Sequence, residues 1–301
     1  MRAPLKNIIR ERLKEIALKR LNARNPKELL RYPLVRFQKA FYPKFSLTDL
    51  MDALRVLGLK KNMTVFIHSS WNSFFNFTSS PVELLEALIE EISPDGTLMM
   101  PAYPQQDVDY FDVLTTPSYA GLLTELFRRY PGVKRSVNID HSVCALGPNA
   151  DYLLNDHHRS ETSWDEFSPY YRIGNIGNAV IMGLGVGKNL EICTSLHCVE
   201  SILRKEIYYY SLIFPTTVTY TYRDTDGNEG THTFLKRTGN MDTKKLAIHM
   251  DKTYFRETKL SNLDIYSIDA GYVIKRAIEL GRAGITQYTY PVPDKKLFYK
   301  I

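Results

Sequence analysis

Hydrophobic and polar positions follow two alternating periods from residue 45 onward, and these periods predict helices and short strands in succession. Apolar residues recur every three or four positions in helices, whereas short apolar runs between turn residues indicate buried strands. The predicted helices span residues 46–58, 81–92, 121–129, 148–154 and 269–280, and the predicted strands span 63–67, 97–100, 142–146, 179–182 and 286–290. This order predicts an α/β sandwich with catalytic groups at strand ends.

A different pattern begins after residue 204. Residues 216–222 and 231–235 alternate around the turn 224–228, which predicts a β-hairpin. The chain contains no internal repeat and no low-complexity linker, so a second globular domain is not required. We therefore predict two parts, a basic helical N-terminal arm of residues 1–44 and one catalytic domain of residues 45–301.

The composition is that of a globular enzyme. The 301 residues are 44% hydrophobic and 24% charged, and no apolar run has the length of a membrane span. The N-terminus lacks the pattern of a secretory signal. Three cysteines, a small and odd number in a chain of this length, do not indicate a disulfide framework. These features predict a cytoplasmic protein.

Positive charge is concentrated in the arm. Residues 1–44 contain thirteen Lys or Arg and three Glu, a net charge of +10, whereas the rest of the chain carries −4. One interpretation is attraction to an anionic membrane surface or a phosphorylated ligand, which would place the protein at the periphery of the inner membrane face. The other is a helix that packs on the domain and exposes its charged face; nucleic acid is a less favoured partner.

The segment Thr194-Ser195-Leu196-His197-Cys198-Val199-Glu200 carries the candidate chemistry. It follows a predicted strand and has helical spacing, so His197 and Glu200, three residues apart, lie on one helix face. A carboxylate beside an imidazole orients it and stabilises its protonated form, as a general base requires. The spacing is also compatible with ordinary hydrogen bonding at a helix start.

Other common chemistries lack their motifs. Residues 183–187 read G-x-G-x-G without the third glycine of a dinucleotide site, and a P-loop is absent. His68-Ser69-Ser70 is not part of a G-x-S-x-G nucleophile elbow. The seven histidines have no metal-ligand spacing, so no metal is expected, and His157-His158 is predicted to be a solvated pair.

Several separated motifs together resemble the aminoglycoside 3-N-acetyltransferase family, also called the antibiotic N-acetyltransferases. They are Val65-Phe66-Ile67-His68-Ser69-Ser70, residues 95–101 (Asp-Gly-Thr-Leu-Met-Met-Pro), Arg135-Ser136 with Ser142 and Gly147, Ser168-Pro169, and Thr194-x-x-His197-x-x-Glu200. The resemblance implies a layered α/β/α sandwich around a central sheet. It also implies transfer of an acetyl group from acetyl-CoA to a primary amine on a sugar ring, by direct attack within a ternary complex.

The resemblance also assigns roles to residues. His197 corresponds to the catalytic base, Glu200 to the acid that orients it, and Thr194 to a contact with the thioester carbonyl or its oxyanion. The positions that match coenzyme A contacts are Ser69, Ser70, Arg135, Ser136, Val137 and Ser142, with Arg135 suited to a phosphate.

The identity of the acceptor amine stays open between hypotheses. Aminoglycosides are polycations that need converging carboxylates, for which the candidates are Asp107, Asp109, Asp112, Asp165 and Glu166. The basic arm would repel them, and Asn138-Ile139 replaces the family's His-Pro. The sequence therefore favours an amino sugar linked to a nucleotide or lipid, for surface polysaccharide assembly. The alternatives are an aminoglycoside resistance enzyme and a non-catalytic protein that binds membrane or nucleic acid through the arm.

Overall fold

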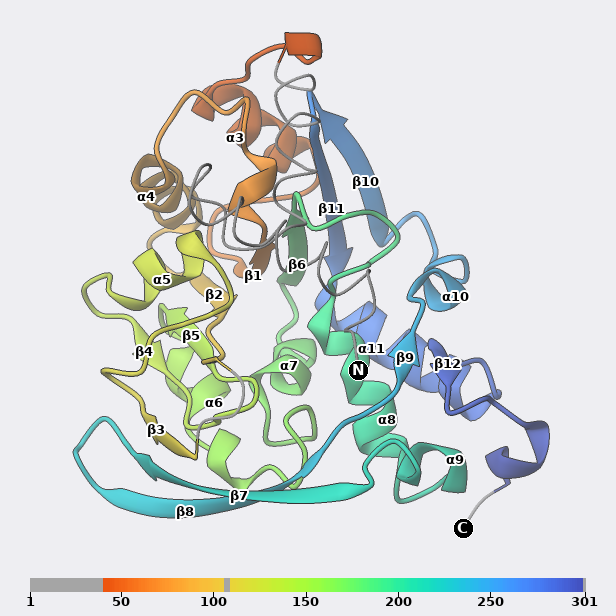
Figure 1. Cartoon of the computed structure of the whole chain (residues 1–301). Helices are drawn as coiled ribbons and strands as arrows, with labels where there is room; N and C mark the ends of the chain where they lie inside the picture. Colours follow the sequence, from red (N-terminus) through yellow and green to blue (C-terminus); the bar gives the residue numbers. More distant parts are fainter. Residues whose placement is uncertain (1–39, 106–108, 300–301) are drawn as a thin grey trace, which may run out of the picture.

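Seven strands form one mixed sheet at the centre of the protein (Figure 1). The computed structural model describes residues 40–105 and 109–299. Strand β1 is parallel to both of its neighbours, β6 and β2, and the other pairs are antiparallel. In order across the sheet, the strands are β10 (Phe255–Leu260), β11 (Leu263–Asp269), β6 (Ala179–Leu184), β1 (Thr64–Ser69), β2 (Thr97–Pro101), β5 (Val143–Leu146) and β4 (Lys134–Arg135).

Three helices cover one face of this sheet: α3 (Leu47–Val56), α4 (Pro81–Ile92) and α5 (Leu122–Arg128). Ser46 and Ser80 begin α3 and α4 with capping boxes, which satisfy backbone N–H groups that have no partner inside the helix. The apolar faces of the helices pack on Val65 and Ile67 of β1, which share one side of the strand.

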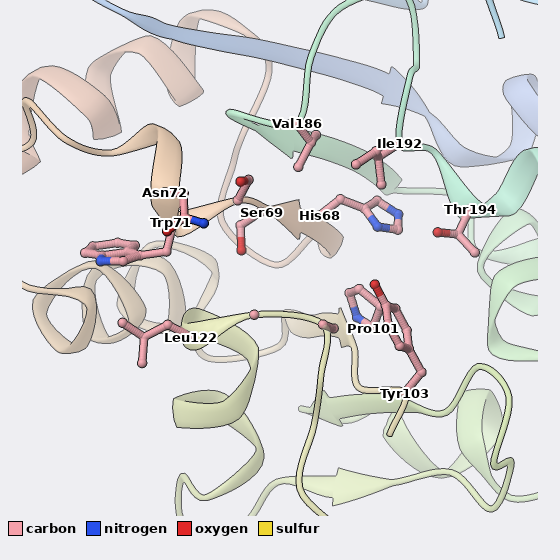
Figure 2. A pocket seen from close by; sticks show the side chains of 13 residues that line it. His68, Ser69, Trp71, Asn72, Pro101, Tyr103, Leu122, Val186, Ile192 and Thr194 are labelled. Atoms are coloured by element: carbon pink, nitrogen blue, oxygen red, sulfur yellow. The ribbon is translucent and has the colours of Figure 1, made fainter. Parts of the chain in front are cut away.

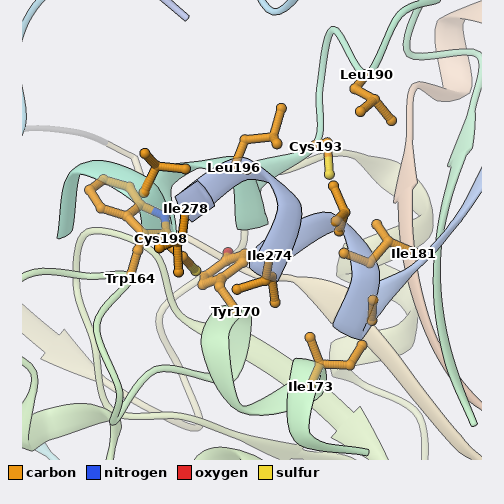
Figure 3. Packing of buried hydrophobic residues seen from close by; sticks show 14 of the residues in the cluster. Trp164, Tyr170, Ile173, Ile181, Leu190, Cys193, Leu196, Cys198, Ile274 and Ile278 are labelled. Carbon is orange, nitrogen blue, oxygen red and sulfur yellow. The ribbon is translucent and has the colours of Figure 1, made fainter. Parts of the chain in front are cut away.

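The opposite face carries α6 (Ala150–Leu154), α7 (Pro169–Arg172), α8 (Cys198–Leu203) and α11 (Ala270–Arg282). Phe66 of β1 points into this layer because successive strand side chains alternate between faces. Figure 3 shows Tyr170, Cys198 and Ile274 in the core that these helices share. With a helix layer on each face, the predicted α/β/α sandwich is confirmed.

Two small sheets complete the described fold. Strands β7 (Thr216–Arg223) and β8 (Glu229–Lys236) form the predicted hairpin, which runs along the bottom of the molecule in Figure 1, and β3 (Tyr110–Asp112) pairs with β7. Strand β9 (Asn240–Met241) pairs with β12 (Tyr288–Tyr290). The other short elements are η1 (Trp71–Ser73), η2 (His157–Arg159), η3 (Ile173–Asn175), η4 (Thr194–His197), α9 (Tyr208–Ser211), α10 (Lys244–Ala247) and η5 (Lys295–Phe298).

The predicted elements agree with the observed ones within a few residues, and the helix at 81–92 has the same bounds as α4. The pattern did not predict β10 and β11, which form one edge of the sheet. Residues 1–39 of the predicted arm lie outside the described residues, so the arm and its boundary stay predictions. Within residues 40–105 and 109–299, no helix combines the length and apolar character needed to cross a membrane.

Candidate active site

The candidate site lies at the carboxyl ends of β1, β2 and β6. Strands β2 and β6 are the two neighbours of β1 in the sheet. After β1 the chain passes through α4, on one face of the sheet, to β2. After β6 it passes to η4 and α8, on the opposite face. Two neighbouring parallel strands whose chains leave in opposite directions open a crevice at their carboxyl ends, where α/β proteins commonly bind ligands.

A cavity of about 400 Å³ occupies this crevice (Figure 2). Its walls come from the ends of β1 and β2, the start of α5 and the loop that joins β6 to η4. The lining residues are His68, Ser69, Ser70, Trp71, Asn72, Pro101, Tyr103, Ala120, Gly121, Leu122, Val186, Ile192 and Thr194. Hydroxyl and apolar groups thus dominate the lining, and its described residues include no carboxylate, lysine or arginine.

Tyr266 of β11 holds one wall of the cavity in place. Its ring packs on Gly183 of β6 so closely that a Cβ atom at residue 183 would lie 2.0 Å from Cε1 of Tyr266. The Tyr266 hydroxyl donates a hydrogen bond to the backbone oxygen of Ile192, over 2.6 Å. Since Ile192 lines the cavity, this contact fixes the loop against the sheet.

His197 and Glu200 form the predicted pair. His197 ends η4, and its Nδ1 atom lies 2.6 Å from Oε1 of Glu200 in α8. The Glu200 side chain is fully buried and that of His197 is 12% exposed. Since Thr194 lines the cavity at the start of η4, His197 stands at the other end of the same helical turn. With Nδ1 engaged, Nε2 is the ring nitrogen left for a substrate.

Glu200 is held by residues that sequence reasoning missed. The Tyr288 hydroxyl donates to Oε1 of Glu200 over 2.6 Å, and Nε2 of Gln287 lies 3.4 Å from Oε2. Arg237 in turn donates from Nη1 to the Tyr288 hydroxyl over 3.3 Å. These residues are far from Glu200 in the chain, and no local motif marks them. They fix the carboxylate so that it can orient the imidazole.

Burial lowers the pKa of His197, and the Glu200 carboxylate opposes part of this shift. A histidine whose pKa is below its usual value is neutral at pH 7 and can accept a proton. The charge of Glu200 stabilises the imidazolium that results. The pair therefore has the electrostatics of a general base.

A second histidine and carboxylate lie across Trp164 from this pair. The indole ring stands 4.8 Å from the ring of His197 and 4.4 Å from that of His141. Nδ1 of His141 is 2.9 Å from Oδ2 of Asp140, which also accepts a hydrogen bond from Ser163. Burial alone would raise the pKa of Asp140, but His141 and Ser163 together lower it to about 2.

The residues predicted to contact the coenzyme divide into two groups. Ser69, Ser70 and Thr194 line the cavity. Arg135 does not: its guanidinium donates to the backbone oxygens of Ala102 and Thr116 and to the hydroxyl of Ser142, and stacks over Phe111. These contacts account for Arg135 as a structural residue, and the geometry gives no support to the predicted phosphate contact.

Ser136, Val137 and Ser142 also lie away from the cavity lining. Ser142 donates to the backbone oxygen of Ala102, and Val137 packs on the small core beneath the β7–β8 hairpin. Ser136 is hydrogen-bonded to Nδ1 of His157 over 2.8 Å. The prediction of a solvated His157-His158 pair is wrong for His157, which is fully buried because its ring nitrogens are satisfied by Ser136 and the backbone of Ser163.

The acidic residues proposed for a cationic acceptor do not converge on the cavity. Asp112 and Asp165 are buried and accept hydrogen bonds from nearby backbone N–H groups, as turn residues do. Asp109 and Glu166 are exposed, and Asp107 lies outside the described residues. Among the described residues, the carboxylate in contact with His197 is instead Glu200, and Asp140 contacts His141. The described part of the chain contains no group of three or more His, Cys, Asp or Glu that could hold a metal ion.

Residues 66–281 match the family model described as aminoglycoside 3-N-acetyltransferase. The match includes α4 and α5 of one helix layer, most of the other layer, the cavity and the His197–Glu200 pair. The chain belongs to the aminoglycoside 3-N-acetyltransferase family. The resemblance seen in the motifs is thereby confirmed.

Curated relatives of this family member include aminoglycoside N(3)-acetyltransferase IV of Salmonella sp, which is 32% identical over 154 residues, or 50% of the chain and 57% of the relative. An SPbeta prophage-derived aminoglycoside N(3')-acetyltransferase-like protein of Bacillus subtilis (strain 168) is 29% identical over 176 residues, 50% of the chain and 63% of the relative. The chain thus spans about three fifths of these relatives' length.

Solved structures share the fold of this aminoglycoside 3-N-acetyltransferase family member. AAC-VIa bound to sisomicin superposes with a TM-score of 0.65 at 24% identity, over 80% of the chain and 98% of AAC-VIa. AAC-IIIb in a binary complex with CoASH has a TM-score of 0.65 at 19% identity, over 83% of the chain and 99% of AAC-IIIb. At these identities the superpositions establish the α/β/α architecture.

Proposed function

We propose that this protein is an acetyl-CoA-dependent N-acetyltransferase that acetylates a primary amine of an aminoglycoside. One observation carries the proposal: the His197–Glu200 pair lies one helical turn from Thr194, which lines a cavity at the carboxyl ends of the parallel strands. Membership of the family supports the acetyl transfer, and the mechanism follows from the arrangement of the residues.

His197 acts as the general base. An ammonium group cannot attack a thioester, so the acceptor must react as the neutral amine, its first proton having left to solvent, and the amine nitrogen must lose a second proton during attack. Nε2 of His197 takes that proton while Nδ1 donates to Glu200, and the charge of Glu200 stabilises the imidazolium. The amine nitrogen then bonds to the acetyl carbon, the carbon–sulfur bond breaks, and coenzyme A leaves as a thiol that receives the proton.

The cavity suits the acyl donor. A pantetheine arm carries amide groups and no charge, and hydroxyls such as Ser69, Ser70 and Thr194 among apolar walls match that chemistry. The phosphates of the coenzyme would lie outside the cavity, since its lining contains no lysine or arginine. This arrangement leaves the side of His197 near Trp164 for the acceptor.

For the acceptor, the relatives favour an aminoglycoside over the nucleotide- or lipid-linked amino sugar that the sequence favoured. The curated relatives are aminoglycoside N(3)-acetyltransferases, and AAC-VIa binds sisomicin. A phosphorylated acceptor is favoured by the positive charge of the arm, most of which lies outside the described residues.

The test is coenzyme A release from acetyl-CoA with two acceptor panels, aminoglycosides including sisomicin and nucleotide-linked amino sugars. We expect turnover with at least one aminoglycoside and its loss in His197→Ala. Turnover with phosphorylated sugars alone would overturn the aminoglycoside assignment and restore the biosynthetic one. Salt-sensitive binding to anionic vesicles or DNA without turnover on either panel would favour the non-catalytic alternative.

Glu200→Gln tests the charge of the pair separately from its geometry. An amide oxygen can still accept from His197 and Tyr288, and the amide of Gln287 can rotate to accept from the new NH₂ group because its Oε1 has no partner among the described residues. We expect kcat to fall about 10–10²-fold, since the imidazolium loses its counter-charge.

The pH dependence of activity shows in which direction Glu200 shifts the pKa of His197. The base works when neutral, so activity is lost as pH falls through the pKa of His197. Glu200 raises that pKa against burial, so its removal should move the acid limb of the kcat/KM profile to lower pH. An acid limb at the same pH in wild type and Glu200→Gln would contradict this account.

A further inference from the structure

His68 is a buried histidine in the cavity wall that the mechanism above does not use. It lies in β1, is 1% exposed, and its ring packs 4.7 Å from the ring of Phe66. Neither ring nitrogen has a hydrogen-bond partner among the described residues. Figure 2 shows the ring directed toward the part of the cavity where Thr194 and Tyr103 lie.

A buried polar group without a partner destabilises a fold, so such groups in native proteins call for an explanation. Other buried histidines here obey the rule: Ser136 and the backbone of Ser163 satisfy His157, and Tyr220 and the backbone of Ser160 satisfy His232. His68 differs because it lines the cavity, with its ring directed toward Thr194 and Tyr103 (Figure 2) and both nitrogens unpaired among the described residues. A ligand in the cavity is the partner that would satisfy them.

The environment of His68 is opposite to that of His197. His197 has a buried carboxylate on Nδ1, whereas His68 has no acidic neighbour among residues 40–105 and 109–299 and lines a cavity whose described residues are uncharged. Burial lowers the pKa of His68 to about 3, so the ring is neutral at pH 7, with one N–H donor and one lone pair. A neutral imidazole cannot compete with His197 for the acceptor's proton, but it can polarise a carbonyl group.

We propose that His68 donates a ring N–H hydrogen bond to the carbonyl oxygen of the acetyl thioester and stabilises the oxyanion formed there. This inference rests on the acetyl transfer proposed above. As the amine nitrogen bonds to the acetyl carbon, the carbonyl electron pair moves to oxygen, which accepts from His68 and Thr194. When that pair returns, the carbon–sulfur bond breaks and the thiolate leaves with the proton that His197 removed.

The positions of the two histidines fit this division. His68 ends the buried run of β1, and Thr194, which faces the same part of the cavity, begins the helical turn that His197 ends. A carbonyl between His68 and Thr194 therefore lies about one helical turn from the base. Donors set in a cavity without charged side chains act at low dielectric, where stabilisation of a developing negative charge is strongest.

The experiment compares wild type with His68→Phe, which keeps a ring against Phe66, and with His68→Gln, which restores an N–H donor. His249→Phe, at an exposed position, is the matched control. The readout is the infrared stretch of acetyl-CoA labelled with ¹³C at the acetyl carbonyl and bound without acceptor. We expect a lower frequency in wild type than in water, a return toward the water value in His68→Phe, and an intermediate value in His68→Gln.

Turnover provides the second readout. For His68→Phe we expect kcat to fall about 10²–10³-fold while the Kd of acetyl-CoA changes less than about threefold, as for loss of an oxyanion donor. The same carbonyl frequency in wild type and His68→Phe, or a loss of affinity that accounts for the loss of turnover, would overturn the assignment of His68 alone. If the wild type does not bind acetyl-CoA, the proposed function itself fails.

Discussion

Replacing His197 with alanine is expected to lower kcat for acetyl transfer by about 10²–10⁴-fold, the usual contribution of a general base. The side chain is the one imidazole whose Nδ1 is held by a fully buried carboxylate beside the cavity within the described residues. Alanine leaves the amine without a proton acceptor, although the donor cavity is intact. Steady-state release of coenzyme A and the Kd of acetyl-CoA, measured on the same preparations, check both parts.

The matched control is His249→Ala, because His249 is exposed and is not among the residues that line the cavity. It should retain wild-type turnover. A base role for His197 also requires that Glu200→Ala lose more activity than Glu200→Gln, since alanine removes the hydrogen bond to the ring as well as the charge. His197→Ala with turnover within tenfold of wild type would show that another group takes the proton.

Arg135→Met is expected to lower the free energy of unfolding by about 3 kcal/mol or more, since each hydrogen bond from a charged donor contributes about 1.5–3 kcal/mol. Methionine fills much of the volume but leaves the backbone oxygens of Ala102 and Thr116 without their buried donor. It also removes the cation over the ring of Phe111. Urea denaturation followed by circular dichroism measures the change.

Arg135→Lys separates this structural role from a phosphate contact. A lysine keeps the charge but cannot reach the same set of acceptors as a planar guanidinium, so we expect a loss of stability with little change in the Kd of coenzyme A. Unchanged stability combined with a tenfold weaker Kd would instead restore the contact that the motif resemblance implied. Ser142→Ala, which removes one acceptor of Arg135, should show a smaller loss of stability.

The parts of the site that sequence predicts well are those made within one local segment. His197 and Glu200 are three residues apart, so helical geometry alone brings them together, and the observed 2.6 Å contact confirms the prediction. Gln287 and Tyr288 reach the same carboxylate through the packing of a distant strand. Spacing along the chain contains no information on such contacts, and they are absent from the sequence-based description.

Burial was the other property that residue types did not reveal. Arg135 and Ser136 resemble ligand-binding residues by type, yet their partners are interior backbone atoms and a buried histidine. His68 received no role from sequence, although it directly continues the apolar run of β1 and so shares its burial. Strand β10 escaped prediction because most of its residues are polar and exposed, as is usual for an edge strand.

The contact between Gly183 and Tyr266 has a consequence for substrate fit. The aromatic ring acts as a spacer between the sheet and the loop that carries Ile192, so a residue outside the cavity lining helps to set the position of one cavity wall. A methyl group at position 183 would displace the ring and, through its hydroxyl, the loop. Homologous proteins that accommodate acyl donors of different width should therefore differ in the residues at positions 183 and 266 together.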